Sequence, residues 1–319
     1  MVTITDVSRL ANVSKATVSR VMSGSRGVKQ ESREAVLRAV EELNYRPNIM
    51  AQSLATQKSD YVGVVLTSSD TGQVSTFLPL LCNALKQRDK RMLVNFADTP
   101  DEYRRVMESW GHGQCDAIIT FGGDIPASAL DKTIAVDSYV HDNCRSISYD
   151  YRFACESACR YLSSQGHASV AILLDGQNYA SQQVLEGYKI AMQNMSIPIN
   201  RQLIVSADES AELAMMNLLN SYSSFTSLIV MKDSHAAIAM KLLQDFNLST
   251  PQDVSILSLE DSSLAKQLTP SLTCISYPSE RLVAVLMKEL DNFLERHPSE
   301  NKSSIQGNLV VRDSVVNRN

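Results

Sequence analysis

The sequence contains no long apolar run and none of the short motifs that mark common enzymes. No uninterrupted apolar stretch approaches the length of a membrane span, and the N-terminus lacks the charged-then-apolar pattern of an export signal. Glycine-rich phosphate loops, a Gly-x-Ser-x-Gly elbow and a His-Glu-x-x-His zinc motif are missing, and the five histidines are scattered. These absences predict a cytoplasmic protein without a membrane partner and argue against an enzyme.

Cysteine is scarce, and its six copies include no Cys-x-x-Cys pair. Cys155 and Cys159 are one helical turn apart if the segment is a helix. Free cysteine commonly behaves as a small core hydrophobe, so buried free thiols are expected rather than a metal or redox centre. The sequence therefore predicts no metal site and no cofactor.

The net charge of −5 hides an uneven distribution along the 319 residues. Up to Lys58 there are nine basic residues against five acidic ones, which gives +4 and leaves −9 for the remainder. With 44% hydrophobic residues, a chain of this length has material for two or three folding units. A basic head joined to an acidic body is expected, and a basic head favours nucleic acid.

Within the basic head, residues 14–21 predict a short helix with one face suited to DNA. Ser14 can cap the helix, while Val18 and Val21 share a face that would be buried. In a major groove, Lys and Arg donate to guanine edges, Ala or Thr methyls meet thymine, and hydroxyls hold phosphates. The exposed face carries side chains of these kinds, namely Lys15, Ala16, Thr17, Ser19 and Arg20.

Two further helices are expected around this stretch. Residues 3–6 have the Thr-x-x-acidic form of a helix start, and apolar residues follow at helical spacing until a break at Asn12. A third helix, over about 30–44, has apolar residues placed to close a small core. Two short helices joined by a tight turn, the second presenting polar and basic groups, predict a helix-turn-helix.

Beyond the third helix the sequence predicts a short linker. Pro47 ends the helix because proline clashes with a continuing helical turn. Asn48 can cap a very short helix that runs through Ala55. A helix this short is marginal alone, so we expect it to form only with contacts from DNA and a partner subunit.

From Tyr61 onward, short apolar runs alternate with amphipathic segments in two successive sets. This alternation predicts parallel sheets covered on both faces, arranged as two similar lobes. Ligands in such folds lie at the carboxyl ends of the strands. Loop residues that follow expected strands are therefore candidates, although polar residues at strand ends also cap helices: Ser68, Ser69, Asp70, Gly122, Asp137, Asp150, Asp175, Lys232, Asp233, Glu260 and Asp261.

The sequence resembles the lactose-repressor (LacI/GalR) family of bacterial regulators, on the motifs at 3–7, 11–14, 17–21 and 42–48. The resemblance implies an all-α helix-turn-helix head over 1–47, a hinge helix and linker over 48–59, and a two-lobed, periplasmic-binding-protein-like α/β core over 60–319. It further implies that lobe 1 comprises about 60–160 plus 278–298. Lobe 2 would then comprise about 161–275 plus 302–319, including a last strand over 304–311.

The resemblance also implies partners and DNA contacts. The family binds a double-stranded, pseudo-palindromic operator as a dimer and responds to a small-molecule effector, often a carbohydrate. By that pattern Lys15, Ala16 and Arg20 read bases, while Thr5, Thr17 and Ser19 mainly hold phosphates. Leu54 of the hinge would enter the minor groove, with Asn48 and Ala51 beside it, although Leu54 as a linker residue packed on the body is the alternative.

At the effector site the sequence departs from the family pattern. Asp137 and Asp233 fit it, and Ser69 is a further candidate at a strand end, but Val184 stands where the family's Arg-x-x-Gly-Tyr has arginine. Lys232 replaces an asparagine and Glu260 an aspartate. Two interpretations stay open. In one the effector has changed, with Lys232 supplying the charge lost at Val184 and Glu260 reaching a hydroxyl or amine; in the other the cleft no longer binds a common sugar.

The competing interpretation is a solute-binding protein of a transport system, which has the same two-lobed body. Such a protein needs an export signal and has no use for a DNA-binding head. The sequence shows the head and not the signal, so we expect a transcriptional regulator, acting as a repressor.

Overall fold

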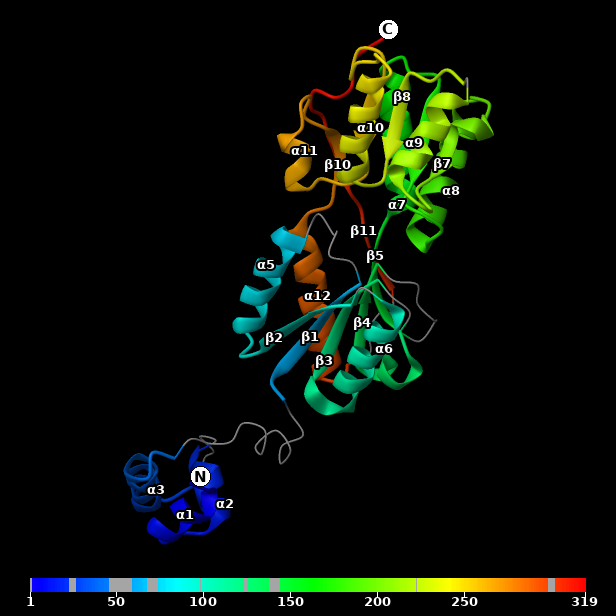
Figure 1. The fold of residues 1–319 in the computed structure, drawn as a ribbon. Helices are drawn as coiled ribbons and strands as arrows, with labels where there is room; N and C mark the ends of the chain where they lie inside the picture. The colour runs from blue at the N-terminus through cyan, green and yellow to red at the C-terminus, as the bar shows by residue number, and fades with distance from the viewer. Residues whose placement is uncertain are drawn as a thin grey trace. The chain divides into compact units, whose positions relative to one another are not determined.

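The computed structural model describes residues 2–22, 27–45, 59–67, 74–97, 99–122, 125–137, 144–221, 223–297 and 302–319. The chain divides into two compact units, Met1–Asp60 and Tyr61–Asn319, which are described separately below (Figure 1).

In the described part of the first unit, three short helices surround a small apolar core. They are α1 (Ile4–Leu10), α2 (Lys15–Met22) and α3 (Gln30–Glu42). At the start of α1, the Thr3 backbone N–H donates to Asp6 Oδ2 at 2.9 Å, and the Thr3 hydroxyl donates to the same oxygen at 2.7 Å. Asn12 makes the turn between α1 and α2 with a φ of 49°, which asparagine tolerates better than most residues. The buried core is Val7, Val18, Val21, Val36 and Ala39.

The second unit begins with a lobe built on a six-stranded sheet of order β11-β5-β4-β3-β1-β2. All five strand pairs in this sheet are parallel. The central strands are buried along their length, as expected for strands covered on both faces. The strands are β1 (Tyr61–Leu66), β2 (Arg91–Phe96), β3 (Ala117–Phe121), β4 (Thr133–Val136), β5 (Arg145–Tyr149) and β11 (Lys302–Ile305), and the helices are α5 (Val74–Lys86), α6 (Pro100–Ser109) and α12 (Ser279–Leu294), with single turns at Trp110–Gln114 and Ala127–Lys132.

The other lobe repeats this plan with the order β12-β10-β9-β8-β6-β7, in which only the short β12 runs antiparallel. Figure 1 shows the two sheets in turn along the second unit, each with its helices. The strands are β6 (Val170–Leu174), β7 (Ile204–Ser206), β8 (Ser227–Val230), β9 (Ser255–Ser258), β10 (Thr273–Ser276) and β12 (Asn308–Val310), and the helices are α7 (Tyr151–Ser164), α8 (Tyr179–Asn194), α9 (Ala211–Asn220), α10 (Asp233–Asp245) and α11 (Ser263–Gln267), with one 3₁₀ turn at Arg201–Leu203.

The chain crosses between the lobes earlier than predicted. The expected crossing near Tyr161 lies inside α7, which packs along α8 of the second lobe. The close packing depends on Gly187, because a Cβ there would lie 2.4 Å from the Arg152 carbonyl oxygen. The first crossing is therefore between β5 and α7.

The predicted single strand over 304–311 is wrong. It is two strands, and β11 belongs to the first lobe, where Ser304 pairs with Ser148. Only β12 joins the second lobe, where Leu309 pairs with Ile275. Gly307 lies between them, and a Cβ at that position would be 2.3 Å from Ile275 Cγ2, so glycine lets the chain pass directly over β10. Three crossovers thus connect the lobes: β5 to α7, β10 to α12, and β11 to β12.

Candidate functional site

In the head, α2 presents the predicted side chains on one side. Lys15, Ala16, Ser19 and Arg20 are exposed, and Thr17 is half-buried. Ser14 caps the helix, since its Oγ accepts from the Thr17 backbone N–H at 3.1 Å and lies 2.9 Å from Thr17 Oγ1. The opposite side, with Val18 and Val21, is buried in the three-helix core. The burial of Val18 and Val21 therefore determines which face of α2 is exposed to solvent.

The other predicted DNA contacts are less constrained by the structure. Thr5 is half-buried in the first turn of α1. Asn48, Ala51 and Leu54 lie outside the described residues, as does the candidate effector residue Ser69. Their roles stay predictions.

At the strand ends of the second lobe, Lys232 is paired with an acid. Its Nζ lies 2.9 Å from Asp175 Oδ2, and His235 Nε2 lies 3.6 Å from the other oxygen of the same carboxylate. Lys232 follows β8 and Asp175 follows β6, so the parallel pairing of these strands brings the two together. The charge predicted to compensate for a missing arginine is thus balanced within the protein.

Two further candidates, Asp233 and Glu260, hold the ends of helices. Glu260 Oε2 accepts from the Asp233 backbone N–H at 2.9 Å, which places a carboxylate at the N-terminus of α10. Asp233 Oδ2 in turn accepts from the Ser262 backbone N–H and hydroxyl, each at 2.7 Å, at the start of α11. Asp233 is 1% exposed, and this burial raises the pKa of its carboxyl. These bonds order the loops at the carboxyl ends of β8 and β9.

The structure does not bring Val184 to this group. Its side chain is 0% exposed on α8 and belongs to the hydrophobic core that includes Cys155 and Cys159 of α7. An apolar side chain at this place packs inward, so it presents no surface to a ligand.

In the first lobe, Asp137 follows β4 with a φ of 51° and lies among tyrosines. The Tyr151 hydroxyl donates a short hydrogen bond to Asp137 Oδ2. Asp137 Oδ1 is shielded from solvent and has no hydrogen-bond partner within the described part of the chain. Burial raises the pKa of the Asp137 carboxyl to about 6, in spite of the bonds that favour its charged form. Sequence reasoning selected Asp137 but missed its tyrosine neighbours.

Because this pKa is raised, Asp137 should cost stability at neutral pH. The native carboxyl, with a pKa of about 6, binds a proton more tightly than the unfolded one, whose pKa is near 4, so stability falls as pH rises from about 4 through 6. We expect Asp137→Asn to raise the free energy of unfolding at neutral pH by roughly 2–3 kcal/mol, at 1.36 kcal/mol per pKa unit. Asparagine also tolerates the positive φ.

Thermal melts at pH 4 and pH 7 check this, with the exposed Asp245→Asn as control. The stabilisation by Asp137→Asn should shrink at the lower pH, and the control should differ little from the wild type at either. A stabilisation equal at both pH values would contradict the assignment.

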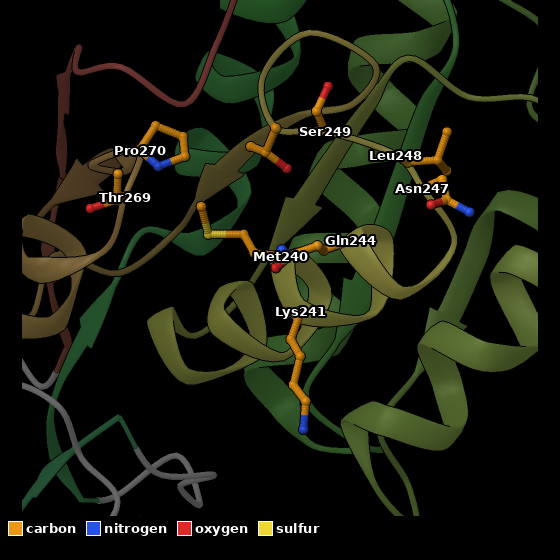
Figure 2. Close-up of a pocket in the computed structure, with 9 residues that line it drawn as sticks. Met240, Lys241, Gln244, Asn247, Leu248, Ser249, Thr269 and Pro270 are labelled. Atoms are coloured by element: carbon orange, nitrogen blue, oxygen red, sulfur yellow. The ribbon is translucent and has the colours of Figure 1, made fainter.

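A hollow of about 640 Å³ lies elsewhere on the second lobe (Figure 2). It is formed at the end of α10 and by the loops that enter β9 and β10, which is the opposite edge of the sheet from Lys232 and Glu260. None of the predicted site residues line it. Its lining is Met240, Lys241, Gln244, Asn247, Leu248, Ser249, Thr250, Thr269 and Pro270.

The cysteines have no disulfide partners, and all are buried except Cys82, which is half-buried. Within the described ranges no group of three or more His, Cys, Asp or Glu side chains is arranged to hold a metal ion. The helices among those residues include none long and apolar enough to cross a membrane.

Comparison with known proteins identifies both units. Residues 3–48 match the family described as bacterial regulatory proteins, lacI family, and residues 159–315 match the periplasmic binding protein-like domain. The transcriptional regulator AscG of Escherichia coli K12 is 27% identical over 99% of both chains. The ribose operon repressor of Haemophilus influenzae is 29% identical, again over 99% of both. The regulator GalR of Salmonella typhimurium LT2 is 32% identical over 87% of this chain and 85% of its own.

Solved structures share the fold. The lac repressor dimer bound to operator and the anti-inducer ONPF superposes with a TM-score of 0.84 at 22% identity, over 99% of both chains. The complex of the regulator CelR with cellobiose gives 0.73 at 21% identity, over 98% of this chain and all of the other. These relatives are transcriptional regulators rather than enzymes. The chain belongs to the lacI family of bacterial regulatory proteins.

Proposed function

We propose that the protein represses transcription by binding a pseudo-palindromic operator as a homodimer, under the control of a small molecule held at the strand ends of its two lobes. The observation that carries the proposal is the two-sided character of α2. Its exposed face is polar and basic, and Val18 and Val21 on the opposite face are buried. The proposal assigns no catalytic step to the chain.

The dimensions and chemistry of α2 suit a major groove. A helix with its side chains is about 10–12 Å across, which matches a groove about 12 Å wide. Lys15 and Arg20 are long enough to donate to guanine edges, and the Ala16 methyl can meet a thymine methyl. Thr5, Thr17 and Ser19 supply hydroxyls for phosphates. The +4 charge up to Lys58 adds a sequence-independent attraction that weakens with salt.

Two heads related by dimer symmetry require an operator with two related half-sites. In the proposal the hinge residues Asn48, Ala51 and Leu54 lie at its centre, where an apolar wedge in the minor groove kinks the duplex. Relatives support the assembly, since the lac repressor structure contains a dimer on its operator.

The effector would be received by Asp137 in the first lobe and by Lys232, Asp233 and Glu260 in the second, with Ser69 as a further contact. Both groups follow strands at the carboxyl ends of parallel sheets, where such folds hold ligands. A ligand that binds one arrangement of the lobes better than another shifts the population of DNA-binding dimers. The cellobiose complex of CelR supports a carbohydrate or carbohydrate derivative as the starting class.

Replacing Arg20 with alanine tests base reading by α2. We expect a loss of about 1–3 kcal/mol in binding to the best operator and a relaxed preference at one base pair, because a bidentate contact to guanine is removed. Selection of bound fragments from genomic DNA, with wild type and variant at one salt concentration, measures both quantities.

Arg38→Ala is the matched control, since Arg38 is an exposed arginine of the same head but lies on α3. It should leave the selected sequence unchanged. If Arg20→Ala weakened binding to every sequence equally, Arg20 would be a phosphate contact. If wild type enriched no sequence with or without cell extract, the repressor proposal itself would fail.

A further inference from the structure

We propose that the effector carries a protonated amine, which is received by the carboxylate of Asp137 and by the tyrosines at the lobe crossovers, Tyr149, Tyr151 and Tyr277. The inference rests on the proposed function and names the chemical class of its ligand.

The three tyrosines come from two different crossovers and meet beside Asp137. Tyr149 ends β5 and Tyr151 begins α7, whereas Tyr277 lies between β10 and α12. The ring centroids of Tyr149 and Tyr277 are 4.4 Å apart, those of Tyr149 and Tyr151 5.9 Å, and those of Tyr151 and Tyr277 6.1 Å. The Tyr151 hydroxyl is bonded to Asp137 Oδ2, which ties the cluster to the carboxylate. The aromatic faces and the acid thus belong to one site.

Two polar atoms in this cluster are left without hydrogen bonds. Asp137 Oδ1 and the Tyr277 hydroxyl are both shielded from water, and neither has a partner among the described residues. Tyr277 is 5% exposed, while Asp137, Tyr149 and Tyr151 are half-buried, so the cluster borders solvent on part of its surface. A buried polar atom without a partner is costly, and an ammonium group has three N–H donors to offer to such oxygens.

The charges around the cluster favour a cation over an anion. After burial, the charges of Asp137 and Glu260 raise the pKa of Tyr149, and those of Asp137 and Asp150 contribute to raising the pKa of Tyr277. The negative charges of these carboxylates therefore act on the tyrosines of the cluster. Two nearby cations among the described residues are paired with other acids: Lys232 lies 2.9 Å from Asp175, and Arg152 lies 3.8 Å from Glu186.

A protonated amine placed here makes two favourable interactions. The carboxylate of Asp137 accepts a charge-assisted hydrogen bond, and the negative faces of the tyrosine rings attract the cation. A sugar phosphate or uronic acid would bring a second negative charge into the same place. The proposal therefore predicts that amino sugars and other small amines bind more tightly than neutral and acidic sugars.

Titration calorimetry of the full-length protein tests the ligand class directly. The probes are pentoses and hexoses, each as neutral sugar, amino sugar and uronic acid, together with putrescine and spermidine. We expect every probe that binds to carry an amine, and each bound amino sugar to bind at least about 10-fold more tightly than its neutral parent. The proposal is overturned if a neutral or acidic probe binds as tightly as its amine counterpart, or if no amine binds at millimolar concentration.

Variants then test the site. Asp137→Asn and Tyr277→Phe should each weaken binding of the amine roughly 10- to 100-fold, the usual loss for a hydrogen bond to a charged group. Tyr161→Phe, which removes a hydroxyl further along α7, should have no effect. Equal affinity for the amine in Asp137→Asn and wild type would overturn the assignment. Selection of genomic fragments reports on the head independently, so DNA binding without amine binding rejects this inference and keeps the proposed function.

Discussion

Replacing Val18 with aspartate is expected to unfold the head and to abolish specific DNA binding while the core remains folded. Val18 is 0% exposed, and among the described residues of the head the buried core has four other side chains. A domain this small has a margin of only about 3–5 kcal/mol. An unpaired carboxylate forced into such a core costs several kcal/mol, so the margin is used up.

DNA binding and thermal unfolding together measure this effect. Affinity for the selected operator should fall roughly 10³-fold or more, to the non-specific level, while the melting transition of residues 61–319 is unchanged. Leu37→Asp is the matched control, because it places the same charge in the same head at a residue that is 50% exposed. If Leu37→Asp impaired binding as much as Val18→Asp, the added negative charge and not the lost core would be responsible.

Replacing Arg312 with methionine is expected to lower the free energy of unfolding of the core by about 3–5 kcal/mol, because it leaves a buried carboxylate unpaired. Arg312 Nη2 donates to Asp261 Oδ1 at 2.7 Å, and the two side chains are 13% and 10% exposed. Arg312 Nη1 also donates to the Leu272 carbonyl oxygen at 2.7 Å, so the guanidinium holds the C-terminal segment on the second lobe.

Denaturant unfolding of single and double variants separates the pair from its surroundings. Adding Asp261→Asn to Arg312→Met should recover much of the loss, since no buried charge remains. Arg318→Met, which removes an exposed arginine from the same segment, should cost about 1 kcal/mol or less. A double variant no more stable than Arg312→Met alone would show that packing, and not charge, dominates.

The same pair predicts a dependence on pH. Burial opposes ionisation of Asp261, but the hydrogen bond and charge of Arg312 prevail and hold the pKa of the Asp261 carboxyl below its ordinary value. The ion pair therefore stabilises the protein above the unfolded pKa of about 4, and this stabilisation is lost as pH falls through the lower native pKa. The difference between wild type and Arg312→Met should accordingly shrink in strong acid.

Local sequence patterns are sufficient to predict those helices and strands whose apolar residues recur with a strong periodicity. The alternation predicted from Tyr61 onward is observed, for example in the strand β2 over Arg91–Phe96 and the helix α8 over Tyr179–Asn194. In the head, Ser14 caps α2 and Val18 is buried, as its spacing predicted. Alternation of apolar runs and amphipathic segments also revealed the two-lobed α/β plan, because each lobe is built from consecutive units.

Features that depend on contacts between distant parts of the chain could not be predicted from the sequence. β5, with Arg145, Ser146 and Ser148 in five residues, is too polar to be recognised alone, and it is a strand because β4 and β11 flank it. The inward packing of Val184 and the pairing of Lys232 with Asp175 depend on how α8, β6 and β8 are assembled. A family pattern assigns such positions by analogy, whereas their contacts are set by packing in this chain.

The late position of β11 affects the synthesis of the protein on the ribosome. Strands β1 to β5 of the first lobe emerge early, but the neighbour of β5 begins only at Lys302, after strands β6 to β10 of the second lobe have been made. Until then the nascent chain carries an open strand edge, and open edges pair readily with other chains. Chains released before Lys302 should therefore aggregate, and the first lobe, although begun first, should be completed only when the last residues of the chain are made.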